Sequence, residues 1–74
     1  MAAKFKRGSK VLWKWLGRGI EGVVEEVHFA PVVKMIKGKR IKRNGSAEKP
    51  AYLVRSSAGN LALKLETEIQ ALDS

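Results

Sequence analysis

Two groups of side chains in this sequence could bind an anion. The first lies in KMIKGKRIKRNG, residues 34–45, where six of the first ten residues are basic and none is acidic. These six are Lys34, Lys37, Lys39, Arg40, Lys42 and Arg43. The second surrounds KVLWKW at residues 10–15 and comprises Lys10, Lys14, Arg18 and the indole of Trp15. Lysine and arginine neutralise phosphates, and an exposed indole can stack on a nucleic-acid base.

Both groups also have a purely structural interpretation. Lysines on an exposed strand prevent edge-to-edge aggregation, and an indole can simply cover one end of a barrel. Trp13 and Trp15 point the same way on a strand, and so small a domain cannot easily bury both. We expect Trp13 in the core and Trp15 at least partly exposed. If the two basic segments meet on one face, they form a weakly sequence-selective phosphate-binding patch; otherwise they form a scattered, solvated surface.

Residue types that catalysis and metal binding require are scarce. The chain has no cysteine and a single histidine, His28, which removes disulfides, thiolate zinc sites and an imidazole cluster. Glu25 and Glu26 are neighbours in an expected strand, where adjacent side chains diverge, so they do not form an acid–base pair. We therefore predict a protein that is not an enzyme and that holds no metal and no cofactor.

Length and charge restrict the partners further. Seventy-four residues with a formal net charge of +8 predict one domain, residues 1–74, that favours anionic partners. Nucleic acid and an acidic protein both satisfy this requirement. No apolar stretch is long enough to cross a bilayer, and none follows the basic N-terminal residues as in a secretory signal. With the absence of cysteine, this predicts a cytoplasmic protein without a membrane partner.

Short β-favouring runs separated by turn residues predict strands. We place them at residues 10–15, 22–29, 32–37, 40–43, 51–56 and 61–65. Turns are expected at residues 17–19 and 57–60, and Thr67 followed by Gln70 predicts one helical turn over residues 67–71. Five or six short strands in so short a chain predict an all-β fold, either a small barrel or a strongly curved open sheet.

The basic stretch is predicted to be a hairpin of this sheet and not a disordered tail. Gly38 followed by Lys39 suits a two-residue turn. In that register Ile36 lies opposite Ile41, and two pairs of like charge oppose each other, Lys37 with Arg40 and Lys34 with Arg43. Such pairs destabilise a sheet unless they lie in open solvent or bind an anion.

Three segments together resemble the hypervirulence-associated protein Tudor domain family. They are FKRGSKVLWKW with GVVEEV, then IKGKRIKRNGSAEKPAYLVRS, then GNLALK, and the similarity runs from about Phe5 to about Ile69. Its most specific part is Arg43 to Val54, whereas Ser9 stands where the family pattern has Asp. The resemblance implies a Tudor-like, SH3-type barrel of about five strands. It implies little about activity.

We predict a non-enzymatic Tudor-like binding module. The leading hypothesis is weak, salt-sensitive binding of nucleic acid through the two basic segments. The alternative is a protein–protein interaction module that binds an acidic partner or a peptide. Recognition of a methylated lysine is disfavoured, because the core needs several of the few aromatic residues and the positive charge repels a basic tail. The sequence leaves the oligomeric state open.

Overall fold

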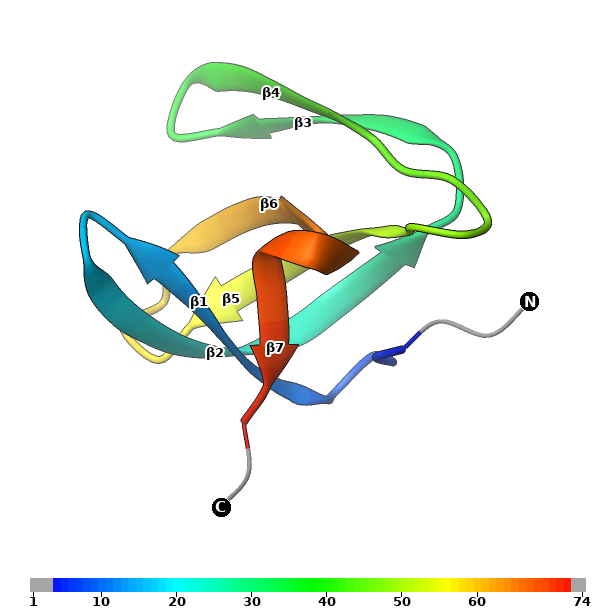
Figure 1. The fold of residues 1–74 in the computed structure, drawn as a ribbon. Helices are drawn as coiled ribbons and strands as arrows, with labels where there is room; N and C mark the ends of the chain where they lie inside the picture. Colours follow the sequence, from blue (N-terminus) through cyan, green and yellow to red (C-terminus); the bar gives the residue numbers. More distant parts are fainter. Residues whose placement is uncertain (1–3, 73–74) are drawn as a thin grey trace.

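The computed structural model describes residues 4–72 of the chain, and within them it is built almost entirely of strands. The described residues form seven strands and one short 3₁₀ turn, whose arrangement can be followed in Figure 1. They are β1 (Lys10–Trp15), β2 (Arg18–His28), β3 (Pro31–Ile36), β4 (Lys39–Asn44), β5 (Ala51–Ser56), β6 (Leu61–Leu65), η1 (Glu66–Glu68) and β7 (Ile69–Ala71). The all-β prediction is confirmed.

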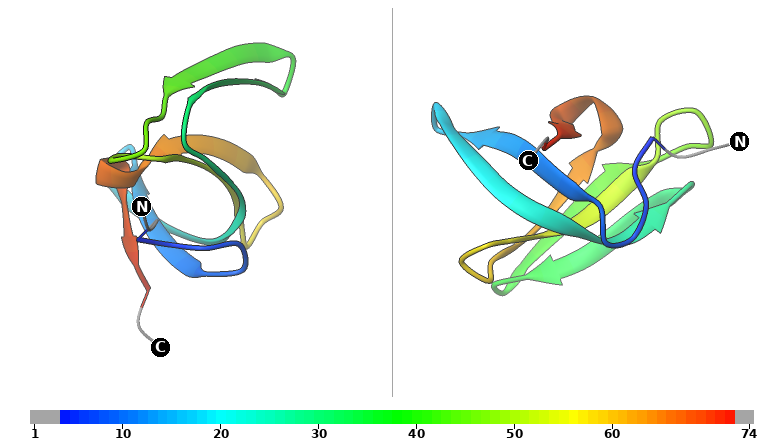
Figure 2. Two further views of the ribbon diagram at one scale, coloured as in Figure 1. Left: turned by 90° about the vertical axis from the view of Figure 1, so that its right-hand side faces the viewer. Right: turned by 90° about the horizontal axis from the view of Figure 1, so that it is seen from below.

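Five strands form one antiparallel sheet in the order β6-β5-β2-β1-β7. The sheet curls into a barrel, which Figure 2 (left) shows as a ring, and η1 connects its two edge strands. The long strand β2 bends at a bulge, where its register with β5 shifts between Val24 and Glu26. Because β2 borders both β1 and β5, this bend helps the sheet to curl.

The barrel core is built from side chains that alternate along the strands. Its buried members are Phe5, Val11, Trp13, Val24, Tyr52, Val54 and Ile69. Trp13 is 5% exposed, as predicted. The hydroxyl of the fully buried Tyr52 donates to Glu66 Oε1 at 2.8 Å and accepts the backbone N–H of Phe5 at 3.3 Å. Burial, and next the bond to Glu66, raise the pKa of Tyr52 to about 12. This residue ties the N-terminal segment, β5 and η1 together.

Strands β3 and β4 form a separate two-stranded sheet, which confirms that the basic stretch is a hairpin. The predicted register is wrong by two residues, because the turn residues are Lys37 and Gly38 and not Gly38 and Lys39. Lys37 has φ 51° and Gly38 has φ 76°. A turn with positive φ at both positions is type I′, in which glycine commonly stands second.

The corrected register removes the expected repulsion between like charges. Lys34 lies opposite Ile41, Arg40 opposite Met35 and Arg43 opposite Val32, while Lys37 belongs to the turn. Each of these cations on the strands therefore has an apolar residue across from it. The hairpin therefore does not need a bound anion to offset repulsion between opposed cations.

The β3–β4 hairpin lies outside the barrel against β6, as Figure 2 (left) shows. Leu53 and Leu63 face each other across β5 and β6 and are buried, although neither belongs to the barrel core. They lie on the outer face of the sheet, because Tyr52 and Val54 on either side of Leu53 face inward. Half-buried residues alternate with exposed ones along β3. The hairpin packs against β6, and its half-buried residues include Val32, Ile36 and Ile41.

The remaining differences from the sequence prediction lie at turns. Strands β1, β5 and β6 have the predicted bounds, whereas β2 begins at Arg18, because the first turn is Leu16-Gly17. The predicted helical turn at 67–71 is a 3₁₀ turn, Glu66–Glu68, followed by β7. The Leu65 N–H donates to Glu68 Oε1 at 2.8 Å, which caps the 3₁₀ turn two residues before the predicted capping pair. Its position lets β7 pair with β1.

Candidate functional site

Three connections lie together at one end of the barrel, on the left of Figure 1. They are the β1–β2 turn, the β3–β4 turn and the loop from β5 to β6. Between them is a groove of about 590 Å³, whose lining includes Trp13, Trp15, Ile20, Lys37, Asn60 and Leu61. The hairpin outside the barrel therefore contributes a side chain to the open end of the barrel.

The two indoles have different environments in this groove. Trp13 is 5% exposed and forms part of its floor, whereas Trp15 is 58% exposed at its rim. The difference follows from strand pairing, because β7 pairs with Val11, Leu12 and Trp13 and ends before Trp15. The expectation that Trp15 is at least partly exposed is confirmed. An indole fixed by a strand and open to solvent is a suitable platform for stacking.

One cation lines the groove, and three more are close to lining residues along the chain. Lys37 lines it, and the exposed side chains of Lys14, Arg18 and Lys39 lie within two residues of lining residues. Among the described residues, none of these four cations forms a salt bridge within the protein, and the lining contains the carboxylate of Glu21. The groove lining thus combines an exposed aromatic ring with one cation and one carboxylate, and further cations lie close to lining residues along the chain.

A smaller depression also has Trp13 in its lining. It measures about 260 Å³, and its lining includes Lys14, Lys64, Thr67 and Glu68. Because Trp13 lines both depressions, they are neighbours on the surface between β1 and β6. Lys14 of the first basic segment is thereby placed beside the groove that Lys37 reaches from the second.

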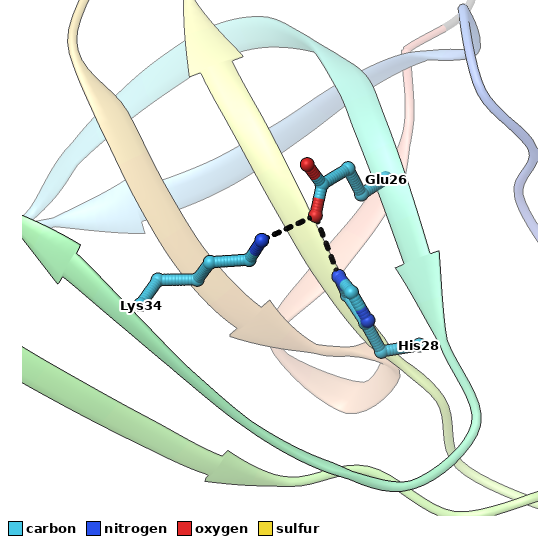
Figure 3. A network of polar contacts seen from close by, with 3 residues as sticks. All are labelled: Glu26, His28 and Lys34. Atoms are coloured by element: carbon cyan, nitrogen blue, oxygen red, sulfur yellow. Dashed lines mark hydrogen bonds and ion pairs between the residues drawn. The ribbon is translucent and has the colours of Figure 1, made fainter.

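Two cations of the basic hairpin are engaged in attaching the hairpin to the barrel. Lys34 Nζ lies 2.8 Å from Glu26 Oε1, and His28 Nε2 lies 2.7 Å from the same oxygen (Figure 3). The hydrogen bond from Lys34, and then that from His28, lower the pKa of Glu26. Arg43 Nε lies 3.6 Å from Glu68 Oε1. These two pairs join β3 to β2 and β4 to η1.

Sequence reasoning missed the part that Glu26 and Glu68 play in this attachment. Each carboxylate meets a cation from a distant strand, and no spacing along the chain signals such a pair. Glu25 has a different partner, Arg55, whose Nε donates at 2.9 Å. The two adjacent glutamates thus bond to different groups, although the bulge interrupts the strand alternation at this point.

The other predicted binding residues lie away from the groove. Arg40 and Lys42 are exposed on the face of the hairpin that carries Met35 and Val33, 67% and 40% exposed. Lys10 lines a separate depression with Arg55. The structure therefore places Trp15 and Lys37 in one groove, whereas Lys14 lines a different depression, and Arg18 and Lys39 are close to lining residues along the chain. It does not add Lys10, Arg40 or Lys42 to the groove, and it uses Lys34 and Arg43 for internal pairs.

Residues 4–72 contain no group of three or more histidine or acidic side chains placed to hold a metal ion. In the same residues, no helix has the length and apolar character needed to cross a membrane.

Comparison with known proteins identifies the family. Residues 8–69 match the family described as "Hypervirulence associated proteins TUDOR domain". No curated protein and no solved structure matches the chain. Because the family match covers nearly the whole chain, the chain belongs to this family, as the resemblance in the sequence indicated.

Proposed function

We propose that this member of the hypervirulence-associated Tudor family is a non-enzymatic module that binds single-stranded nucleic acid weakly at the barrel-end groove. One observation carries the proposal. Lys37 and Trp15, which come from different sheets, line the same groove. A cation beside an exposed indole provides the two contacts that a single strand offers everywhere, a phosphate and a base face.

Each residue has a distinct role in this proposal. Trp15 stacks on an unpaired base, and Lys37 neutralises a phosphate next to it. Lys14, Arg18 and Lys39 extend the positive surface along the strand on either side. Duplex binds less well, because its bases are already stacked on one another and cannot reach the indole. Binding is weakly sequence-selective, since phosphate contacts and stacking are available to every base.

The net charge of the protein supports the same partner. A formal charge of +8 attracts a polyanion over a distance and raises its rate of association at low salt. The local surplus of cations at the groove then determines where the strand docks. An acidic protein would share this attraction, but it would not use the exposed face of the Trp15 indole for base stacking.

The test is a titration of the protein against single-stranded and duplex DNA and RNA of equal length at several salt concentrations. We expect single strands to bind more tightly, with an affinity that falls as salt rises. Lys37→Gln should reduce the slope of log affinity against log salt by about 0.7, the contribution of one phosphate contact. Trp15→Ala should cost about 1–3 kcal/mol on single strands and much less on duplex.

Lys49→Gln is the matched control for the lysine variant. Lys49 is exposed and lies in the loop between β4 and β5, at the opposite end of the barrel from the groove (Figure 1). Its removal changes the net charge equally and should leave the affinity nearly unchanged. Equal effects of the two substitutions would show that only total charge matters. No binding at low salt would reject the proposal entirely.

A further inference from the structure

The outer edge of β4 carries no backbone partner among the described residues. The β3–β4 sheet contains only two strands, so β4 pairs with β3 on one side alone. Both Figure 1 and Figure 2 (left) draw β4 at the margin of the molecule, with no described segment beyond it. This edge is separate from the groove, because no residue of β4 lines the groove.

The geometry of the turn determines which backbone groups this edge presents. In a hairpin closed by a two-residue turn, the residues flanking the turn exchange both hydrogen bonds, and the pattern then alternates. Ile36 and Lys39 flank the turn, so the N–H and C=O groups of Arg40 and Lys42 point away from β3. The described loops supply no backbone bond to these groups, although the Lys42 C=O accepts a hydrogen bond from Arg43 Nη1 at 3.0 Å. The N–H groups of Arg40 and Lys42 and the C=O of Arg40 are open to a further strand, which would compete with the Arg43 side chain for the Lys42 C=O.

The side chains along β4 determine which strand fits. Four of its six residues are basic, namely Lys39, Arg40, Lys42 and Arg43. Because strand residues alternate, the cations flank the edge on both faces of the hairpin. A second copy of β4 would place cation against cation, which opposes self-pairing. A strand rich in Glu or Asp would meet complementary charge at the same positions.

The exposed face of the hairpin adds a small apolar contact. Met35 and Val33 lie across from Arg40 and Lys42 and are 67% and 40% exposed. An apolar side chain of an added strand would pack beside the aliphatic stems of Arg40 and Lys42 and reach these two residues. The arrangement therefore fits a segment that alternates acidic and apolar residues better than it fits a phosphate chain.

We infer that β4 is a docking edge for an extended acidic segment of another protein, which adds to the hairpin as a third strand. Backbone hydrogen bonds to Arg40 and Lys42 provide register, and the cations provide selectivity for acidic segments. The inference does not depend on the proposed function, because it uses the backbone edge of β4 and a different class of partner, although Lys39 is near both surfaces.

The test uses a seven-residue peptide that alternates Glu and Val, added to the isotope-labelled full chain and followed by NMR. We expect shifts and slower hydrogen exchange at the amides of Arg40 and Lys42. Two peptide controls separate the causes. Replacing Glu by Gln should weaken binding about tenfold, the combined effect of several exposed ion pairs. The second control consists of two peptides, one methylated on the backbone nitrogens of its odd residues and one on those of its even residues. At least one of them should fail to bind, because it lacks the N–H groups that face β4.

Two substitutions at one position separate the backbone contact from charge. Lys42→Gln removes the charge and keeps the outward N–H, so it should weaken peptide binding by a few fold. Lys42→Pro also removes that N–H, yet spares the bonds to β3, and should abolish the added strand. Trp15→Ala should not change peptide binding. The Gln variant keeps the test valid if the proline variant does not fold.

Several outcomes would overturn the inference. Equal binding of the acidic peptide and both methylated peptides would show that no strand is added. Peptide-induced shifts confined to Trp15 and Lys37 would place the peptide in the groove. Concentration-dependent shifts at β4 without peptide would identify a second copy as the occupant, and shifts there with a single-stranded oligonucleotide would identify nucleic acid.

Discussion

The two hairpins of this domain have the same turn but different surroundings. Leu16 and Gly17 have φ of 51° and 78°, and Lys37 and Gly38 have 51° and 76°. The β1–β2 hairpin lies between β7 and β5 and is hydrogen-bonded on both sides, whereas the described residues supply no strand on either side of β3–β4. The local sequence closes both hairpins, but the tertiary partners decide how firmly each is held.

The difference extends to side chains. Strands β1 and β2 bury Val11, Trp13 and Val24, while no residue of β3 or β4 is fully buried. The β3–β4 hairpin depends on half-buried apolar residues and on the pairs of Lys34 with Glu26 and Arg43 with Glu68. Few buried contacts mean low local stability. The barrel therefore forms the rigid wall of the groove. Lys37 belongs to the β3–β4 hairpin, which is the less stable of the two structures that line it.

The largest expected effect comes from truncating matched apolar residues of the two hairpins. Trp13→Ala should cost about 3–5 kcal/mol and destabilise the whole fold, because it empties the barrel core. Ile36→Ala, in the half-buried face of β3, should cost about 1–2 kcal/mol. Chemical denaturation followed by circular dichroism measures both. Equal losses would contradict the distinction between barrel and hairpin.

Tyr52→Phe tests the bonds that hold the barrel. Loss of the hydroxyl leaves the Phe5 N–H without its acceptor and leaves Glu66 Oε1 with the Lys4 N–H as its donor, and it should cost about 1–2 kcal/mol. Folding raises the pKa of Tyr52 from 10.0 to about 12. The neutral phenol therefore stabilises the fold fully below pH 10, and this contribution is lost as pH rises toward about 12.

The phenylalanine variant should lack this part of the alkaline destabilisation. Denaturation midpoints of the two proteins across that pH range measure the difference. If the stability of the variant falls as steeply with rising pH as that of the native protein, Tyr52 does not contribute to the alkaline destabilisation. The hairpin residues Lys34 and Glu26 should have no influence on this comparison.

Glu26→Gln should have the smallest effect on the free energy of unfolding, because Glu26 and its partners Lys34 and His28 are partly exposed. Folding lowers the pKa of Glu26 below its ordinary value of 4.5, so the pair with Lys34 is complete above that value. It is lost as pH falls through the lowered pKa. At neutral pH, the amides of β3 and β4 should exchange faster in the variant than in the native protein. In the native protein, exchange in these strands should become faster only in acid.

Glu25→Gln is the matched control for that experiment. Glu25 is the neighbouring residue and bonds Arg55 of β5, outside the hairpin. Its substitution should leave exchange in β3 and β4 unchanged, once rates are corrected for the intrinsic effect of pH. If both variants loosen the hairpin equally, the pair of Glu26 with Lys34 does not attach it.

Local patterns in the sequence predicted the elements but not their assembly. The bounds of β1, β5 and β6 followed from alternation and glycine turns, and the burial of Trp13 and exposure of Trp15 followed from strand geometry. The β3–β4 register failed, because both Gly38-Lys39 and Lys37-Gly38 satisfy the hairpin signal. The two turns pair different residues across the hairpin. Only the fold shows that the Lys37-Gly38 turn is the one used.

The candidate site was predictable only in part. Basic residues and Trp15 indicated the chemistry, but their grouping depends on the barrel end and on the attachment of the hairpin. The bulge between Val24 and Glu26 places Glu26 opposite Leu53 on the outer face, where Lys34 reaches it. No local signal marked this bulge, so the sequence could not show that Lys34 is occupied while Lys37 is free.

The most direct test is an NMR titration of the native protein with a single-stranded oligonucleotide at low salt. The two hairpins should respond together, with shifts at the Trp15 indole N–H and the Lys37 amide that saturate at the same oligonucleotide concentration. Arg40 and Lys42, on the other face of the same hairpin, should shift little. Shifts at Arg40 and Lys42 without any at Trp15 would contradict a site shared by barrel and hairpin.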